Sequence, residues 1–246
     1  MDIYLETKIR MKKIGLVVVT ILFLSKLNAQ TTVFDDLLQK HVTKNGIVDY
    51  KSFKIDERKL DSYISYLEIT SPEKTWSKNK QKAFWINAYN AYTIKIILEN
   101  YPLKSIMDIK QEGNSAWKIP FVKVGDKTYT LDYIEHEILR KTVFDPRIHV
   151  GINCASGSCP KLSNTAFTEE NIDSELTRLM KAFINDSSRN KISKETIEIS
   201  SIFDWFKDDF TKNSSLIAYL NTYSKTEINT NAKISYLKYD WSLNSK

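Results

Sequence analysis

Cysteine, histidine, glycine and proline are all scarce in this chain of 246 residues. It has two cysteines, three histidines, six glycines and five prolines. With so few glycines and prolines, and with no low-complexity tract or internal repeat, the sequence has no obvious linker between domains. We therefore predict a single domain with one sizeable core over residues 30–246.

The most apolar stretch, residues 14–24, is too short to cross a bilayer, which takes about 20 residues. Two lysines precede it and a small residue, Ala29, follows it. This is the order of a secretory signal peptide, which we predict over residues 1–29, with Met11 as an alternative start. We expect an exported protein, periplasmic or secreted, without stable membrane insertion after signal cleavage. No cysteine follows the stretch that could carry a lipid of the bacterial lipoprotein kind.

A strong positive charge is also missing once the predicted signal is set aside. The whole chain has a net charge of +6, whereas residues 30–246 keep 31 basic and 28 acidic side chains, a net charge of +3. The lysines of residues 51–59 and 181–194 are scattered among acids. This pattern is typical of a solvated surface, so we expect no nucleic-acid partner.

Apolar residues at helical spacing dominate the rest of the sequence. They predict helices over residues 33–41, 60–67, 79–100, 168–184, 202–210 and 216–223. Strands are predicted as a hairpin of residues 121–124 and 127–130, and over residues 148–153, 196–200 and 233–239. The predicted fold class is α+β, a compact, helix-rich domain with a small, mostly antiparallel sheet.

A further helix, predicted between Thr130 and Arg140, carries a carboxylate on its apolar face. At about 100° per residue, Glu135 falls in the same stripe as Ile138. A buried carboxylate must be neutralised or paired, because an unpaired buried charge costs several kcal/mol. Two partners are open for Glu135: an arginine such as Arg147 in a structural ion pair, or a histidine whose ring it would orient.

His149 is the natural histidine partner. In a strand over residues 148–153, its side chain points away from the apolar face, and Gly151 beside it leaves room for another chain or a substrate. A lone histidine in a strand is more often a hydrogen-bonded core residue. The combination with Glu135 favours a functional role.

Both cysteines follow directly, in the stretch NCASGSCP. The small residues between them expose backbone N–H groups in a tight turn, and such groups stabilise a thiolate or a developing oxyanion. Cys154 is therefore a candidate nucleophile. It lies five residues after His149, so the two side chains meet only if the chain bends at Asn153 or Cys154. Otherwise His136 or His41 would be the base.

A disulfide between Cys154 and Cys159 is the alternative to a free catalytic thiol. Export makes the compartment oxidising and the even cysteine count suits a bridge, although closing so short a loop stabilises little. A free thiol, a bridge and a redox-switched thiol all stay open. A zinc site of both cysteines with His149 and His136 lacks the spacing of structural zinc motifs, so we predict no metal and no cofactor.

Two amides stand out in the helical segment AFWINAYNAYTIKIIL. Asn87 and Asn90 are three residues apart, so they share one face, and buried amides need hydrogen-bond partners. They either fasten neighbouring backbone, which is the simpler interpretation, or position a substrate together with Arg147. The aromatic residues predicted to be core are Phe84, Trp85, Tyr89, Tyr92, Phe203, Trp205, Phe206 and Phe210.

Several segments, in this order, resemble the uncharacterised domain of unknown function 547 family. They are NGIVDY, AFWINAYNAYTIKIIL, YPLKSIMDI, YTLDYIEHEILR, DPRIHVGINCASGSCPKL, ISSIFDWFKDDF and YLKYDWSLN, and they cover nearly all of residues 30–246. The family is similar to papain-like or transglutaminase-like cysteine enzymes. This implies a Cys-His-acid site at Cys154, His149 and Glu135, in a rearranged topology because papain has the reverse order. The resemblance also favours a role for Cys154 beyond forming a disulfide.

The sequence thus predicts a thiol hydrolase or acyltransferase that acts on amide bonds of peptide or cell-wall material. Cys154 is the predicted nucleophile, His149 the general base and Glu135 the orienting acid, with N–H groups of the turn after Cys154 as oxyanion donors. The alternative is a non-catalytic binding domain in which a Cys154–Cys159 disulfide shapes a recognition loop.

Overall fold

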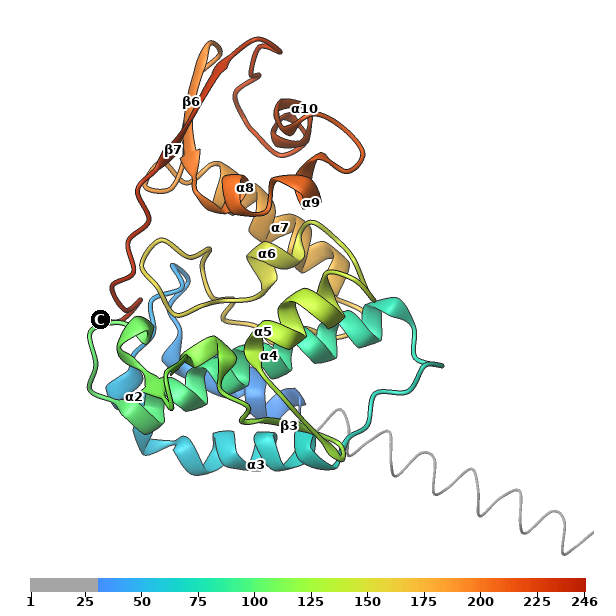
Figure 1. The fold of residues 1–246 in the computed structure, drawn as a ribbon, viewed down its shortest axis with the longest axis vertical. Coiled ribbons are helices and arrows are strands. Elements are labelled where there is room, and N and C mark those ends of the chain that lie inside the picture. Colours follow the sequence, from blue (N-terminus) through green and yellow to red (C-terminus); the bar gives the residue numbers. More distant parts are fainter. Residues whose placement is uncertain (1–30) are drawn as a thin grey trace, which may run out of the picture.

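The longest helix, α4 (Lys78–Asn100), lies at the centre of the fold (Figure 1). In the computed structural model, which describes residues 31–246, nearly all of its side chains from Ala83 to Leu98 are buried. A helix that is apolar on all sides must be covered on all sides. The other elements therefore pack around α4, and the buried apolar side chains of the described residues form one connected core.

The first part of the chain covers one side of α4. It consists of a helix over residues 31–41, α2 (Tyr50–Ile55), α3 (Glu57–Ile69) and the hairpin of β3 (Val122–Val124) and β4 (Lys127–Tyr129). Helix α3 packs against both α4 and β3. Along the chain, four short elements lie between α4 and β3: the 3₁₀ turns Ile106–Asp108 and Ala116–Lys118 and the strands β1 (Lys110–Gln111) and β2 (Asn114–Ser115).

The second part covers the opposite side. Its elements are α5 (Leu131–Tyr133), the π-helix η3 (Ile134–Leu139), α6 (Ile148–Gly151), α7 (Ile172–Ile184), β5 (Lys191–Ile192), β6 (Thr196–Ser200), α8 (Ile202–Trp205), α9 (Lys207–Thr211), α10 (Leu216–Asn221) and β7 (Lys233–Leu237). Figure 1 shows β6, β7 and α10 at one end of the molecule, away from α3.

The described strands form three small sheets. The pairs β1–β2 and β3–β4 are antiparallel, and the third sheet has the order β5–β6–β7. In it β5 is antiparallel to β6, whereas β7 is parallel to β6 with Ile234 beside Ile197. The predicted α+β class, helix-rich with small and mostly antiparallel sheets, is confirmed.

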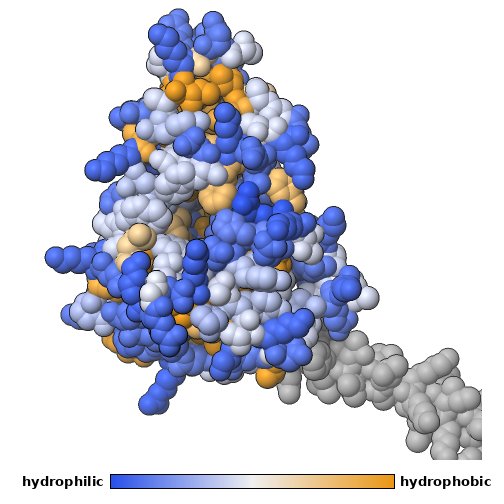
Figure 2. All heavy atoms as spheres, in the orientation of Figure 1, coloured by the Kyte–Doolittle hydropathy of each residue, from blue (hydrophilic) through white to orange (hydrophobic). Residues whose placement is uncertain are grey.

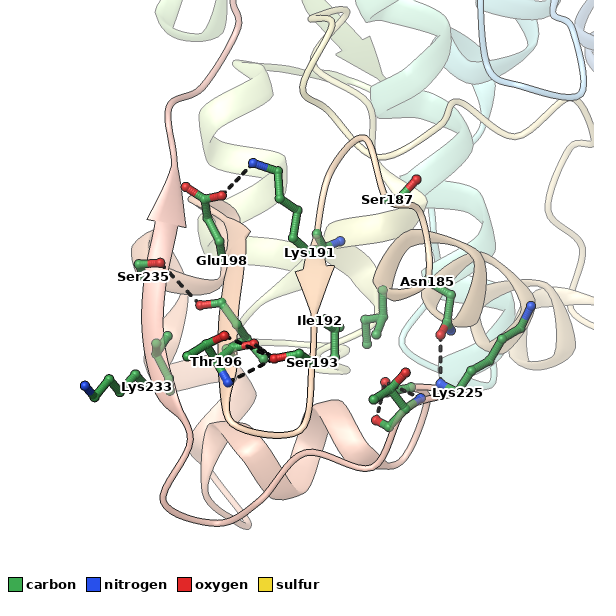
Figure 3. A pocket seen from close by; sticks show the side chains of 16 residues that line it. Asn185, Ser187, Lys191, Ile192, Ser193, Thr196, Glu198, Lys225, Lys233 and Ser235 are labelled. Carbon is green, nitrogen blue, oxygen red and sulfur yellow. Dashed lines mark hydrogen bonds and ion pairs between the residues drawn. The ribbon is translucent and has the colours of Figure 1, made fainter.

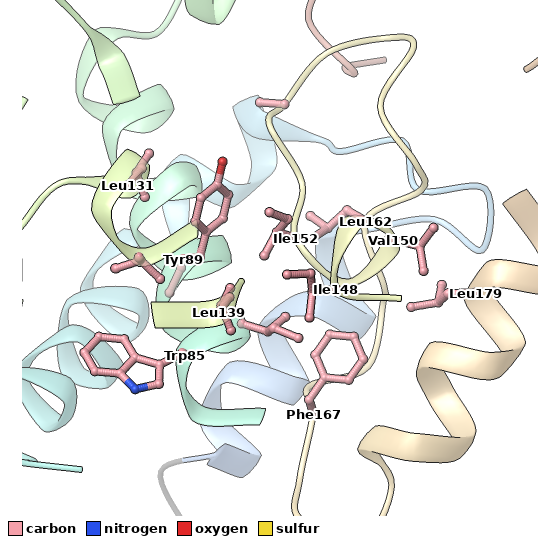
Figure 4. Packing of buried hydrophobic residues seen from close by; sticks show 14 of the residues in the cluster. Trp85, Tyr89, Leu131, Leu139, Ile148, Val150, Ile152, Leu162, Phe167 and Leu179 are labelled. Carbon is pink, nitrogen blue, oxygen red and sulfur yellow. The ribbon is translucent and has the colours of Figure 1, made fainter. Parts of the chain in front are cut away.

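The strand predicted over residues 148–153 is wrong. The chain forms one helical turn, α6, and becomes extended only at Ile152. A short apolar run does not have enough periods to distinguish a buried strand from a buried helical turn. Figure 4 shows the result: Val150 points toward Leu179 of α7, while Ile148 lies near Leu139 of η3.

Gly151 also has a different role from the one predicted. A Cβ atom at this position would lie 2.9 Å from Leu176 Cδ2 and 3.0 Å from Ile86 Cδ1. The missing side chain therefore lets α6 pack closely between α4 and α7, and it does not make room for a substrate.

The predicted signal peptide, residues 1–29, lies outside the described residues. From residue 31 to residue 246, the structure contains no helix that combines the length and the apolar character needed to span a membrane.

Candidate active site

A cavity of about 200 Å³ brings together the three residues predicted to form a Cys-His-acid site. Glu135 of η3, His149 of α6 and Cys154 all line it. The rest of its wall is largely aromatic, with Tyr89, Trp117, Trp205, Phe206, Tyr239 and Trp241. A small, mostly apolar cavity with a few polar groups that converge is the usual form of a binding or active site.

Cys154 reaches this cavity because the chain turns at the end of α6. Ile152 has extended backbone angles, φ −86° and ψ 147°, directly after the helical turn. Asn90 fixes the turn from α4: its Nδ2 donates to the carbonyl of Gly151 and its Oδ1 accepts from the N–H of Asn153, both at 2.9 Å. The chain therefore bends at Ile152, slightly before the bend at Asn153 or Cys154 that was predicted to bring Cys154 toward His149.

His149 is held by a carboxylate that the sequence analysis did not single out. Its Nε2 lies 2.8 Å from Oδ2 of Asp209, and its ring stacks on Phe206 with centroids 4.0 Å apart. Because the carboxylate accepts a hydrogen bond, Nε2 carries the proton and Nδ1 keeps its lone pair. Burial lowers the pKa of His149, although Asp209 opposes this, so the neutral ring is favoured.

Arg140 holds Asp209 from the other side. Its Nε and Nη2 donate to the two carboxylate oxygens at 2.6 and 3.0 Å, a two-point contact that fixes the carboxylate plane. Burial acts to raise the pKa of Asp209, but hydrogen bonds from His149 and Arg140 keep it well below its usual range. Asp209 is therefore a charged, immobilised partner for His149.

The two other histidines are engaged elsewhere. His136 lines the cavity, but its Nδ1 lies 2.9 Å from Nη1 of Arg140. His41 lies outside the cavity, with its Nε2 2.8 Å from Oδ2 of Asp56. Because Arg140 can only donate, Nδ1 of His136 accepts and its Nε2, 3.6 Å from Oδ1 of Asp132, carries the proton of the neutral ring, which leaves His149 as the cavity histidine with an unoccupied lone pair.

Glu135 faces that free nitrogen. Its Oε1 lies 3.9 Å from Nδ1 of His149, too far for a hydrogen bond. Burial, with a further contribution from Cys154, raises the pKa of Glu135 to about 8, although Arg140 opposes this shift. Glu135 therefore holds a proton at neutral pH. It sits in a π-helical turn, a rare geometry that is frequent at functional sites.

The residues predicted to position a substrate are bound to other parts of the protein. Asn87 pairs with the backbone N–H and carbonyl of Phe167 at 3.0 and 2.7 Å, and Asn90 fixes the turn described above. Arg147 donates from Nη2 to Asp145 at 2.7 Å, so it does not form the predicted structural pair with Glu135. None of the three lines the 200 Å³ cavity. Both amides fasten backbone, as the simpler interpretation predicted.

Cys154 is a half-buried free thiol, and Cys159 is a buried one. The sulfur of Cys154 lies 3.2 Å from Oγ of Ser156 and 3.3 Å from the hydroxyl of Tyr239. Hydrogen bonds from Cys159, Ser156 and Tyr239 lower the pKa of Cys154, although burial opposes them. A lowered pKa makes the thiolate, which is the nucleophilic form, available near neutral pH. The disulfide stays a prediction for oxidising conditions.

Most N–H groups of the turn after Cys154, which were predicted as oxyanion donors, bond within the protein. The N–H of Ser156 interacts with the sulfur of Cys154 and contributes to lowering its pKa. The other donors of the turn bond to acceptors in the protein at 2.7–3.1 Å, namely those of Ala155, Gly157, Ser158 and Cys159. Two of these acceptors are the carbonyls of Asp240 and Ser242, in the segment after β7. This long-range pairing could not be predicted from the turn alone.

Aromatic residues form the rim of the cavity. The ring of Tyr239 packs against Trp205 and Trp241, with centroids 4.7 and 4.6 Å apart, and Trp117 packs edge-on against Trp241. Trp205 was predicted to be core but is 50 % exposed, because the chain breaks between α8 and α9 at Phe206. Two residues of this rim, Tyr239 and Trp241, belong to the segment YLKYDWSLN. That segment contributed to the family resemblance but was not predicted to be part of a site.

A larger hollow of about 890 Å³ lies beside the three-stranded sheet (Figure 3). In it Lys191 pairs with Glu198 at 2.7 Å, and the N–H of Lys225 donates to Asn185. Its other lining residues are mostly serine, threonine and isoleucine, without cysteine or histidine. Figure 2 shows a mainly hydrophilic face with one apolar patch near this end of the molecule. Thiol chemistry therefore belongs to the smaller cavity.

The four residues considered as zinc ligands, His136, His149, Cys154 and Cys159, all line the cavity. Within the described part of the chain, no three histidine, cysteine, aspartate or glutamate side chains are arranged to hold a metal ion. Cys154 and His149 share a cavity, but each has its own hydrogen-bond partners.

Comparison with known proteins gives a family match for the middle of the chain. Residues 73–184 match the family model described as "Protein of unknown function, DUF547". This stretch of the chain is similar to the DUF547 family. The match confirms the resemblance predicted from the motifs, over a shorter span than the motifs suggested. No curated protein and no solved structure gives a significant match, so a papain-like or transglutaminase-like topology stays a prediction.

The DUF547 region supplies only part of the cavity. Glu135, His149 and Cys154 lie within it, whereas Asp209 and Tyr239 come from the chain that follows. The C-terminal third therefore completes the site, by holding the histidine and by contacting the sulfur.

Proposed function

We propose that this protein is a cysteine-dependent hydrolase or acyltransferase acting on amide bonds of peptide or cell-wall material. One observation carries the proposal: Cys154 and His149 line one small cavity, and Asp209 fixes the imidazole from behind at 2.8 Å. A nucleophile, a neutral base and a charged orienting group are the parts that covalent acyl transfer requires.

The reaction begins when the sulfur of Cys154 attacks the carbonyl carbon of the amide. A C–S bond forms, the carbonyl oxygen takes up the electron pair, and Nδ1 of His149 takes the thiol proton. As the C–N bond breaks, the imidazolium returns this proton to the leaving nitrogen, which gives an amine and a thioester. Water or an acceptor amine then attacks the thioester and loses its proton to His149, and the thiol leaves.

Asp209 takes the orienting role that was predicted for Glu135. Its charge stabilises the imidazolium that forms during both steps. Glu135 keeps its own proton up to pH about 8, so it does not compete with Asp209 for the imidazole N–H. We assign Glu135 to the cavity wall beside Nδ1, where a neutral carboxyl leaves the lone pair of that nitrogen available.

The substrate class follows from the proposed location. A signal peptide over residues 1–29 would carry the protein to the periplasm or the medium, where peptides and cell-wall cross-links are the abundant amides. Expression of the full chain, followed by mass measurement of the exported product, tests this directly. A product that begins at Gln30 is expected, and one that retains residues 1–29 in the cytoplasm would contradict it.

The test of the chemistry uses 4-nitrophenyl acetate, a small activated ester that needs no specific recognition. Cys154 is expected to acquire an acetyl group, visible by intact mass and located by peptide mapping, with a burst of nitrophenolate. Cys154→Ala is expected to lose both signals, and Cys159→Ser, the matched control, is expected to keep them. Release of new amino groups from purified peptidoglycan or a peptide mixture then tests the substrate class.

The rival function, a non-catalytic domain with a disulfide-shaped loop, predicts another result. Thiol titration of the native exported protein without reductant would then find no free thiol, and reduction would not produce acylation of Cys154. A folded Cys154→Ala protein that still turns over a substrate would remove Cys154 from the nucleophile role.

A further inference from the structure

We infer that the hydroxyl of Tyr239 is the oxyanion donor of this site. This inference rests on the proposed acyl transfer at Cys154 and adds a catalytic residue to it. Tyr239 lies in the segment after β7, outside the matched family region, and its hydroxyl lies 3.3 Å from the sulfur of Cys154.

The position of the hydroxyl fits the place where negative charge develops. After the attack, the oxyanion is bonded to the carbon that the sulfur has just joined, so it is only two bonds from the sulfur. A donor that contacts the sulfur before attack is therefore within reach of the oxyanion after it. Oγ of Ser156 donates to the Tyr239 oxygen at 3.0 Å, so the phenol proton of Tyr239 is available for the sulfur of Cys154 before the attack and for the oxyanion after it.

Most backbone donors of the turn are engaged at this site. The N–H groups of residues 155, 157, 158 and 159 bond within the protein, whereas the N–H of Ser156 interacts with the sulfur, as the Tyr239 hydroxyl does, and can assist it. The phenol is also suited to donate rather than to ionise. Burial, together with the neighbouring cysteines, raises the pKa of Tyr239 above its usual value, so the hydroxyl keeps its proton at neutral pH.

The ring of Tyr239 is fixed before any substrate binds. It packs against both Trp205 and Trp241, and the N–H of the following residue, Asp240, donates to Oγ of Ser158 at 2.8 Å. A donor that is already oriented costs no reorganisation when the charge forms, which is the condition for strong electrostatic stabilisation.

The experiment compares two reactions of the same sulfur in Tyr239→Phe. Acetylation by 4-nitrophenyl acetate passes through an oxyanion, whereas alkylation by iodoacetamide forms the C–S bond by expelling iodide and does not. Both rates depend on the thiolate fraction, so their ratio at one pH cancels any change in the pKa of Cys154. We expect Tyr239→Phe to lower the acetylation-to-alkylation ratio by about 10-fold or more.

Tyr236→Phe is the matched control, because Tyr236 lies on the adjoining strand β7, is half-buried and does not line the cavity. Its ratio is expected to equal that of the wild type. If Tyr239→Phe fails to fold, Ser156→Ala decides, since it removes the hydrogen bond that aims the hydroxyl and is expected to lower the ratio less strongly. A wild-type ratio in the folded test variant overturns the oxyanion role but leaves the proposed function standing. A wild-type protein that is alkylated but never acetylated overturns both.

Discussion

Asp209 and His149 are 60 positions apart in the chain, yet their side chains meet at 2.8 Å beside the cavity that holds Cys154. Arg140 donates to both oxygens of the same carboxylate. The imidazole is thereby fixed with Nδ1 facing Glu135 in the wall of the cavity. The histidine thus keeps a lone pair, which a general base requires, and it lines the same cavity as a thiol.

Asp209→Asn is expected to lower the rate of Cys154 acetylation by about 100-fold or more, since the neutral amide cannot stabilise the imidazolium or select the Nε2–H tautomer. Stopped-flow release of nitrophenolate measures this rate. Asp208→Asn changes an exposed neighbour on the same helix and should react as the wild type does.

Asp209→Asn also leaves Arg140 without its carboxylate, so the variant should lose stability as well. Thermal unfolding in parallel separates the two effects. Acetylation at the wild-type rate in a folded Asp209→Asn protein would mean that His149 does not act as the base.

Glu135 should make stability depend on pH. Its pKa is raised from 4.5 to about 8 in the folded protein, so the folded state binds the proton more tightly than the unfolded state. The contribution of Glu135 to the free energy of unfolding is therefore fully present below pH 4.5 and is lost as pH rises to about 8. The loss is at most about 1.4 kcal/mol per pH unit. Glu135→Gln mimics the protonated form and should unfold at a higher temperature than the wild type at pH 7 to 8.

The difference between Glu135→Gln and the wild type should shrink toward zero near pH 4, where the wild-type carboxyl is protonated in both states. Glu137→Gln, on the exposed side of η3, is the matched control and should show no such growth of the difference with pH. A constant difference from pH 4 to pH 8 would show that Glu135 does not titrate as its burial implies.

Local patterns in the sequence were sufficient for much of the fold. The apolar pattern of α4 and the placement of Glu135 in an apolar helical face are confirmed, because each depends on periodicity over several turns. Thr130 caps the predicted helix by accepting from the N–H of Tyr133 at 2.9 Å. The short run around His149 was misassigned as a strand, since it is too short to show a period.

The composition of the site was less predictable, because it depends on pairings between distant segments. Asp209 follows the break at Phe206, where the sequence suggested an uninterrupted helix, so its direction could not be inferred. Tyr239 reaches Cys154 only because the segment after β7 folds back over the cysteine turn. Neither contact has a local signal, whereas Cys154 and His149 are close in the chain and were identified together.

Asn90 should be necessary for both stability and thiol reactivity. Asn90→Ala leaves the buried carbonyl of Gly151 and the buried N–H of Asn153 without partners, which should cost about 2–5 kcal/mol in the free energy of unfolding. The turn that directs Cys154 into the cavity would also loosen, so the rate of alkylation by iodoacetamide should change. Denaturant titration and alkylation kinetics measure the two effects.

Asn79→Ala, an exposed substitution in the first turn of the same helix, serves as the control for Asn90→Ala and should leave both measurements near wild type. Unchanged stability in Asn90→Ala would indicate that water or a shifted backbone satisfies the two groups, and that α6 does not depend on this clamp.

Cys154 and Cys159 should act as a redox switch on the proposed activity. The N–H of Cys154 already donates to Sγ of Cys159 at 3.1 Å, so the second thiol lies beside the first. Oxidised glutathione should form a mixed disulfide with the reactive Cys154, and Cys159 should then displace glutathione to close the bridge. Acetylation should stop, intact mass should show the loss of two hydrogens, and dithiothreitol should restore both.

Cys159→Ser tests whether the second thiol resolves that intermediate. It should still be acetylated at Cys154, but with oxidised glutathione it should keep the glutathione adduct because no second sulfur can displace it. If the wild type also stops at the glutathione adduct, Cys159 cannot reach Cys154 to close the disulfide. The hydrogen bonds from Arg189 to the carbonyls of Cys159 and Gly157 would explain this, since they fix the backbone that must move. Cys159 would then serve to lower the pKa of Cys154 through its hydrogen bond, and the site would not be switched by oxidation.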